Sequence, residues 1–202
     1  MKKVFSSILV CILVLTMVAC GKEPTVIPAE PEIVQMRAIC ELSTMNCYYH
    51  NVAKYFEENA SKGLWGLGKK DKHFWVEYSA EVTLGIDASL VTMEISDNQV
   101  TITIPPAEVQ GKPRVHSNTL TKDSYIIAKD SADVTAQDET TVFADAQENI
   151  KALAEADKTL LATAQDRAKM LLEDYVTNIG KVTGVDYSIK WVYVDSEGNP
   201  IK

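Results

Sequence analysis

The stretch from Trp75 to Pro106 constrains the fold more than any other part of the chain, because its apolar and polar residues alternate almost without interruption. In a β-strand successive side chains point to opposite faces, so this alternation predicts a strand with one buried face. The residues expected on the buried face of the first strand are Val76, Tyr78, Ala80, Val82, Leu84 and Ile86. Those expected on the solvated face are Glu77, Ser79, Glu81, Thr83 and Asp87, and solvation alone accounts for their carboxylates.

Two shorter strands follow and are predicted to form a hairpin. The apolar residues that alternate with polar ones on either side of Asp97-Asn98 are Val91, Met93, Ile95, Val100, Ile102 and Ile104. A two-residue turn at Asp97-Asn98 places Ile95 opposite Val100. A slip of one residue would turn every apolar side chain to the wrong face, so the pattern and the turn indicate the same register.

The N-terminus has the features of an exported protein. Lys2 and Lys3 precede an apolar run of 16 residues that ends at Ala19, which is short for a membrane span and typical of a secretory signal. The run leads into Met17-Val18-Ala19-Cys20, which resembles the lipobox of bacterial lipoproteins, although Met17 stands where Leu is usual. We therefore expect residues 1–19 to be a signal peptide and Cys20 to carry lipid. The alternatives are an ordinary signal peptide with an incidental cysteine, or an uncleaved anchor helix.

Residues 20–32 are then the lipidated cysteine and a tether with three prolines, and residues 33–202 form a single domain. Two or more acyl chains hold a protein stably on a membrane, so the expected location is the cell membrane, facing outside the cytoplasm. Removing Lys2 and Lys3 with the leader leaves 18 basic and 28 acidic residues, a net charge of −10. An acidic domain is repelled by phosphate backbones, so a nucleic-acid partner is excluded.

The rest of the domain divides by its periodicity. Helical spacing predicts a short helix over 32–42, and alternation predicts a first strand over 43–56. A glycine- and charge-rich loop is expected over 57–72. Residues 107–137 keep neither period for long, apart from Tyr125 to Ala128, and are expected to form an extended connection.

The C-terminal third is predicted to be helical, followed by one strand over 185–193. The apolar residues at helical spacing are Phe143, Ala146, Ile150, Leu153, Leu160, Leu161, Ala164, Ala168, Leu171, Leu172, Tyr175 and Ile179. Asp157 interrupts this face and predicts a break, and Gly180 is expected to provide the left-handed cap that ends the helix. The predicted class is α+β, with a largely antiparallel sheet of about five strands and the C-terminal helices on one face.

Cys40 and Cys47 are the two cysteines that remain in the domain, since Cys11 leaves with the leader and Cys20 is lipidated. An exported pair of cysteines can form a disulfide. They can equally be two small buried residues on different elements, and a separation of seven residues leaves both readings open.

No catalytic, cofactor-binding or metal-binding motif is predicted. The stretch Gly63 to Lys69 matches GxxxxGK, but a phosphate-binding loop needs Ser or Thr after the lysine, a strand before it and a helix after it. The histidines at 50, 73 and 116 are far apart in the sequence, and on a strand Cys47 and His50 point to opposite faces. A Ser-His-Asp triad can assemble from distant residues, so spacing does not exclude one.

The loop over 57–72 is the candidate contact region. Trp65 lies in a glycine-rich stretch beside the basic residues Lys69 and Lys70, and such a tryptophan can either contact a partner or cover the edge of the sheet.

Several motifs are shared with a known family. They are a tyrosine-bearing first strand, a GLG-K-K loop, Trp75-x-Glu-Tyr leading to Gly85-Ile86-Asp87, Thr101-Ile-Thr-Ile-Pro105-Pro106-Ala-Glu108, and an alanine-rich helix from Ala162 to Gly180. Over residues 33–195 the chain resembles the bacterial family catalogued as domain of unknown function 4230. The resemblance implies a fold and an envelope context, and supplies no catalytic residues.

Two functions follow as hypotheses. The first is a lipid-anchored binding or envelope-assembly module with an envelope protein as partner, without a cofactor. The alternative is an envelope hydrolase whose site assembles from scattered residues near the loop from Gly63 to Lys72. One polar substitution that leaves the fold intact would abolish the activity of a hydrolase. A binding module would tolerate such a substitution.

Overall fold

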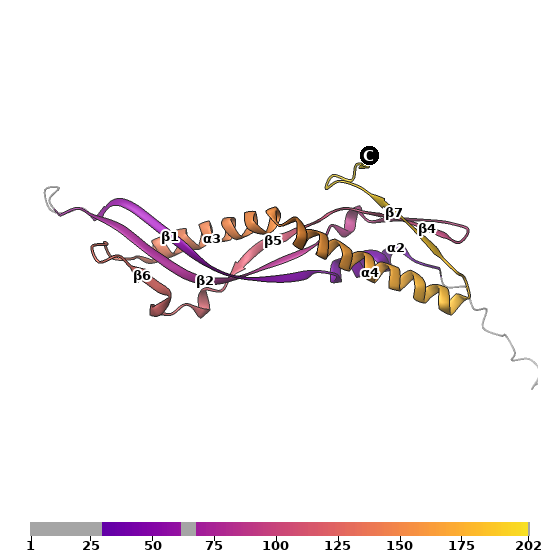
Figure 1. Ribbon diagram of the computed structural model, residues 1–202, viewed down its shortest axis with the longest axis horizontal. Coiled ribbons are helices and arrows are strands. Elements are labelled where there is room, and N and C mark those ends of the chain that lie inside the picture. Colours follow the sequence, from indigo (N-terminus) through magenta and orange to yellow (C-terminus); the bar gives the residue numbers. More distant parts are fainter. Residues whose placement is uncertain (1–29, 62–67, 202) are drawn as a thin grey trace, which may run out of the picture.

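The computed structural model describes residues 30–61 and 68–201 and has the predicted α+β architecture (Figure 1). Antiparallel strand pairs dominate, and two long helices follow most of the strands in the sequence. The strands form two sheets rather than one, and a continuous hydrophobic core joins them to the helices. Within the described residues, no helix is long and apolar enough to cross a membrane.

The centre of the fold is a long antiparallel hairpin of β1 (Met45–Ser61) and β2 (Lys70–Ile86). The apolar face of β2 is buried as predicted, with Val76, Tyr78, Ala80, Val82, Leu84 and Ile86 at most 4% exposed. The predicted loop over 57–72 is shorter than expected, because β1 continues to Ser61 and β2 starts at Lys70. The polar residues at the ends of the two strands gave the prediction of a loop. Residues 57–59 and 70–71 are exposed because the hairpin projects into solvent, so they need not be apolar.

The prediction of an extended connection over 107–137 is wrong. Residues Ala107–Val115 form β5 and Tyr125–Ile127 form β6, and both pair with β2 on the side away from β1. Two 3-10 turns, η4 (Ser117–Thr119) and η5 (Lys122–Ser124), join them. Alternation is hidden in β5 because Gly111 has φ 70° and the register with β2 shifts between Glu81 and Thr83. Such a bulge displaces the side-chain pattern by one position.

The second sheet has the order β3-β4-β7. A 3-10 turn, η3 (Ala88–Leu90), leads into β3 (Thr92–Ser96), which pairs with β4 (Gln99–Ile104) in the predicted register, with Ile95 opposite Val100. The C-terminal strand β7 is Ser188–Tyr193 and runs parallel to β4, which is the one parallel pairing among the described strands. A parallel neighbour requires a long crossover, and the two C-terminal helices supply it.

The helices form as their sequence predicts and break where it predicts. Helix α3 (Ala136–Ala156) and helix α4 (Lys158–Thr183) are separated at Asp157, whose carboxylate accepts hydrogen bonds from the backbone N–H groups of Thr159 and Leu160 at 3.1 and 3.0 Å. Asp157 therefore caps α4 rather than facing the core. The buried residues on the two helices include Val142, Ala146, Ile150, Ala154, Ala164, Ala168, Leu172 and Val176.

The predicted left-handed cap at Gly180 is wrong by four residues. Gly184 has φ 74° and ends α4, while Gly180 lies inside the helix. A Cβ at position 180 would lie 2.5 Å from the carbonyl oxygen of Val185, so this glycine is required by close packing of the returning chain. The sequence offers two glycines at a helix end, and only the contact with the returning chain distinguishes their roles.

The molecule is long, and its two ends are built from different elements (Figure 1). At one end lie the start of α2 (Ile33–Leu42), the last turns of α4 and the start of β7. The backbone N–H of Glu32 donates to the hydroxyl of Tyr175 on α4 at 2.9 Å. This hydrogen bond holds the residue before α2 against α4. The last residues of β1 and the first residues of β2, which we call the hairpin tip, lie at the other end (Figure 1). The start of α2 and the hairpin tip are thus far apart along the long axis.

Candidate functional site

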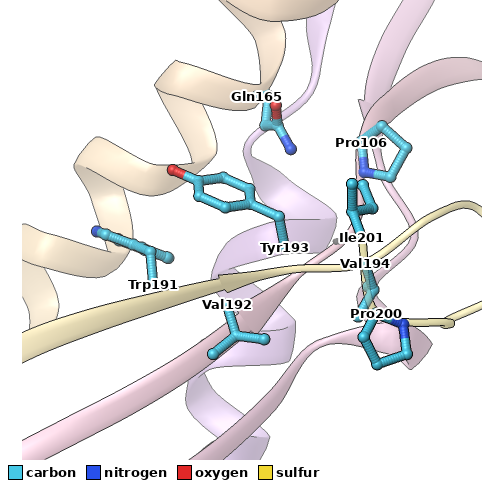
Figure 2. A pocket seen from close by; sticks show the side chains of 8 residues that line it. All are labelled: Pro106, Gln165, Trp191, Val192, Tyr193, Val194, Pro200 and Ile201. Atoms are coloured by element: carbon cyan, nitrogen blue, oxygen red, sulfur yellow. The ribbon is translucent and has the colours of Figure 1, made fainter.

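Of four cavities along the described residues, the largest lies between α4, the end of β7 and the C-terminal turn (Figure 2). It has a volume of about 590 Å³ and is open to solvent. The residues that line it are Pro106, Gln165, Trp191, Val192, Tyr193, Val194, Pro200 and Ile201. Most of these side chains are apolar or aromatic, which is typical of a surface that binds a ligand or peptide.

The local fold explains how these residues meet. Alternation along β7 puts Trp191 and Tyr193 on one face of the strand, toward α4. After Val194 the chain turns back, because the Asp195 carboxylate accepts the backbone N–H groups of Glu197 and Asn199 at 2.9 and 2.8 Å. This turn brings Pro200 and Ile201 over the end of the strand and closes one side of the cavity.

A lysine on α4 covers the two aromatic rings. The Lys169 ammonium lies 5.3 Å from the ring centre of Trp191 and 5.5 Å from that of Tyr193, within the range of cation–π attraction. A hydrogen bond with Tyr193 raises the pKa of Lys169, so the ammonium is charged at neutral pH. The indole N–H of Trp191 donates to Glu173 at 3.1 Å. The rings are therefore held in place before any ligand arrives.

The lining of this cavity has no catalytic set. None of its eight residues is Ser, Cys, His, Asp or Glu, so the cavity itself offers no nucleophile other than the Tyr193 hydroxyl. The amide N–H of Gln165 is already donated to the carbonyl of Pro105 at 2.8 Å. The aromatic side chains of the lining offer apolar contact area, and the Gln165 amide already has a partner within the protein.

A second constellation lies on the solvated face of the β1–β2 hairpin. His50 Nδ1 is 3.3 Å from Ser79 Oγ, and His50 Nε2 is 2.6 Å from Glu77 Oε1. A Ser-His-acid triad also has a histidine between a serine and an acid, but there the serine contacts Nε2 and the acid contacts Nδ1, so the two ring nitrogens are exchanged here. The His50 and Glu77 side chains are 66% and 55% exposed on an open strand face, where solvent competes for every contact. The sequence did not place these residues together because the register of β1 on β2 decides it.

The third polar cluster is buried beneath the hairpin tip. Lys72 Nζ lies 2.6 Å from Asp138 Oδ2 on the first turn of α3 and 3.6 Å from Glu57. Burial alone would raise the pKa of Asp138, but the hydrogen bonds from Lys72 and Thr135 outweigh it and hold the pKa at about 2. The same hydrogen bond raises the pKa of Lys72 against the opposing effect of burial. This pair joins the hairpin to α3 and is structural.

The predicted contact loop lies only partly within the described residues. Trp65 and Gly63 are outside them, whereas Lys69 and Lys70 are exposed at the hairpin tip and line a cavity of about 380 Å³. The other residues around it are Phe56, Asp71, His73, Ala128, Asp130 and Ser131. Lys72 follows Lys69 and Lys70 closely in the sequence but is not part of this surface, because its charge is buried and paired with Asp138.

The cysteines lie on different elements. Cys40 is buried on α2, where burial raises the pKa of its thiol to about 12, and Cys47 is half-buried on β1. Both are free thiols in the structure, and their disulfide stays a prediction. Cys20 lies outside the described residues. Within the described part of the chain, no three His, Cys, Asp or Glu side chains gather in a metal-binding arrangement.

Fold and cavities together define an elongated α+β domain with an aromatic cavity at its side. The family model described as "Protein of unknown function (DUF4230)" matches residues 34–186, so the chain belongs to this family. No curated protein and no solved structure matches the chain. The family accounts for most of the chain, and the aromatic cavity lies at the edge of the matched region, since Trp191 and Tyr193 come just after it.

Proposed function

We propose that this protein is a lipid-anchored lipoprotein of the bacterial cell envelope that acts outside the cytoplasm as a binding or assembly module for another envelope protein. The lipobox at Cys20 and the proline-bearing tether support the anchor. The aromatic cavity beside Trp191 and Tyr193 supports the binding role, because it offers apolar contact area without a catalytic set.

The observation that carries this proposal is the placement of the ends. Glu32, the last residue of the proposed tether, contacts Tyr175, whereas the start of β2 lies at the opposite end of the long axis (Figure 1). Helix α3 has 21 residues and helix α4 has 26, so the two are about 32 and 39 Å long. A protein anchored beside the start of α2 would hold its hairpin tip well away from the membrane.

Lipid attachment is tested with Cys20→Ala in cells fed a labelled fatty acid. We expect labelling of the wild-type chain and none of the variant. If the variant is still labelled, Cys20 is not the anchor and the membrane part of the proposal is withdrawn.

The binding role is tested by photo-crosslinking in intact cells. A photoreactive amino acid is placed at Tyr193 beside the cavity or at Lys70 at the hairpin tip, with Lys158 on the exposed start of α4 as the control position. We expect a discrete crosslinked partner at Tyr193 or Lys70 that is absent at Lys158 and is lost when Trp191→Ala is added to the Tyr193 probe. Crosslinks that are equal at all three positions, or absent at both test positions, contradict a specific binding module.

A second candidate, hydrolysis, follows from the contacts of His50 with Ser79 and Glu77. These residues lie in the middle of the hairpin rather than beside the loop from Gly63 to Lys72. A fluorophosphonate probe that labels the wild-type chain and Ser117→Ala but not Ser79→Ala would support an activated serine. An unlabelled wild-type chain would remove this candidate.

A further inference from the structure

The outer edge of β1 is open along the length of the strand. Among the described strands, β1 pairs only with β2, so its other side has no strand neighbour. An unpaired edge presents N–H and C=O groups that another strand can bind. Helix α3 does not occupy this edge, because it packs over the inner face through Val142, against Phe74 and Val76.

Hydrogen bonds on the far side of β2 show which residues of β1 face the open edge. The carbonyl of Ser79 accepts from His116 N–H at 2.9 Å, and that of His73 accepts from Ala128 N–H at 3.0 Å. The carbonyls of Ser79 and His73 therefore point away from β1. The residues opposite them on β1, His50 and Phe56, make no hydrogen bond to these carbonyls. Backbone direction alternates along an antiparallel strand, and the even-numbered residues of β1 therefore point to the open edge.

Val52 is the centre of this edge. Its N–H donates to the side chain of Asn51 at 2.8 Å, as expected for a backbone donor without a strand partner. The three large apolar residues on the solvated face are evenly spaced about it, with Tyr48 75%, Val52 48% and Phe56 59% exposed. Tyr48 and Phe56 are each four residues from Val52, one on either side. Two copies of β1 paired antiparallel about Val52 would therefore set Tyr48 of each against Phe56 of the other.

The charges allow the same pairing. The whole chain has a net charge of −8, yet no Asp or Glu occurs from Met45 to Phe56. Two copies meeting along this segment would therefore bring no carboxylates into opposition, and Lys54 of each would lie opposite His50. Pairing centred on Lys54 would instead set the two lysines against each other. The edge of β1 is thus suited to a second copy in one register.

We propose that β1 is a self-association site, at which a second copy of this chain adds its own β1 antiparallel with the two-fold axis at Val52. The hydrogen bond of Val52 to Asn51 is exchanged for a pair of backbone hydrogen bonds between the two Val52 residues. The paired segment from Cys47 to Glu57 ends where the β1–β2 register shifts, between Glu57 and Ser61. A strand edge about 37 Å long and about 10 Å thick buries roughly 700 Å² in total, which corresponds to a weak dimer.

A weak dimer is best trapped covalently. Directly opposite residues in a hydrogen-bonded antiparallel pair have Cα atoms about 5.5 Å apart, which a disulfide can span. In the proposed register this holds for position 52, whereas the two residues at position 54 are about 14 Å apart and beyond reach. The register thus predicts which cysteine crosslinks.

The experiment uses the full-length chain with Cys40→Ala and Cys47→Ser as the parent. Val52→Cys and Lys54→Cys are each added, cells carrying two differently tagged copies are lysed, and copper phenanthroline is applied before a non-reducing gel. We expect a mixed-tag dimer with Val52→Cys and none with Lys54→Cys or the parent. No dimer at position 52, or equal dimer at both positions, overturns the proposal. Circular dichroism of each variant shows that it is folded.

Discussion

The buried ion pair between Lys72 and Asp138 should contribute strongly to stability, and removing the lysine is the sharpest test of the fold. Lys72 is 6% and Asp138 5% exposed, and their charged atoms lie 2.6 Å apart. In Lys72→Met the Asp138 carboxylate stays buried and keeps only its bonds from Thr135, N–H and hydroxyl, both at 2.7 Å. Breaking a buried pair from one side costs about 3–5 kcal/mol, and the remaining bonds put the expected loss near about 3 kcal/mol.

The pH dependence of the free energy of unfolding is an independent test of this ion pair. The pKa of Asp138 is lowered from 3.8 to about 2 in the folded protein, so its stabilisation is complete above pH 4 and is lost as the pH falls through about 2. That shift corresponds to about 2 kcal/mol. In Lys72→Met the carboxylate loses its cation, the pKa of Asp138 rises, and this part of the acid sensitivity should disappear.

Urea unfolding followed by far-UV circular dichroism at pH 7 and pH 3 measures both effects. Lys129→Met is the matched control, because Lys129 is an exposed lysine two residues after β6, which pairs with β2 close to Lys72. We expect the control to change the free energy of unfolding by less than about 0.5 kcal/mol. A loss below about 1 kcal/mol in Lys72→Met, or an unchanged pH dependence, would refute the assignment of this pair as the link between hairpin and α3.

Three further predictions concern the helices and the cysteines. Gly180→Ala should destabilise the protein by more than about 2 kcal/mol in thermal unfolding, because its Cβ would lie 2.5 Å from the carbonyl of Val185; a neutral effect contradicts this packing. Asp157→Ala should cost about 1 kcal/mol by removing the cap of α4, and Asp157→Asn should recover most of it. Maleimide should modify Cys47 well before Cys40 at pH 8, since burial raises the pKa of Cys40 to about 12. Peptide mass spectrometry gives the order of modification, and equal rates would argue against the burial of Cys40.

Periodicity identified the elements whose two sides differ in solvation. The buried face of β2, the β3–β4 register and the break before α4 were all predicted, because each depends on the order of apolar and polar residues along a short segment. The same reasoning failed for β5, where Gly111 and a bulge disturb the alternation. It also failed for the ends of β1 and β2, where residues 57–59 and 70–71 are exposed whichever face they lie on and therefore carry no period. Lys72 is polar but buried, because it pairs with Asp138.

The candidate sites were harder to predict than the fold. The predicted strand over 185–193 contains Trp191 and Tyr193, but nothing in the sequence indicates that Lys169 covers them, because the contact joins two elements. His50 and Ser79 are likewise neighbours only through the register of two strands. A site composed of residues from separate elements has no local pattern.

The sequence by itself determined which residues face inward, because burying an apolar side chain is favourable whatever the chain packs against. The residues at its N-terminus also predict an exported location, and this stays a prediction. Tertiary structure alone decided that β7 runs parallel to β4. It also decided that a glycine is required at position 180 by packing and at position 184 by its backbone angle. Finally, it decided that Lys72 is neutralised rather than exposed. These features depend on distances between segments far apart in the chain, and such distances exist only once the core has brought those segments together.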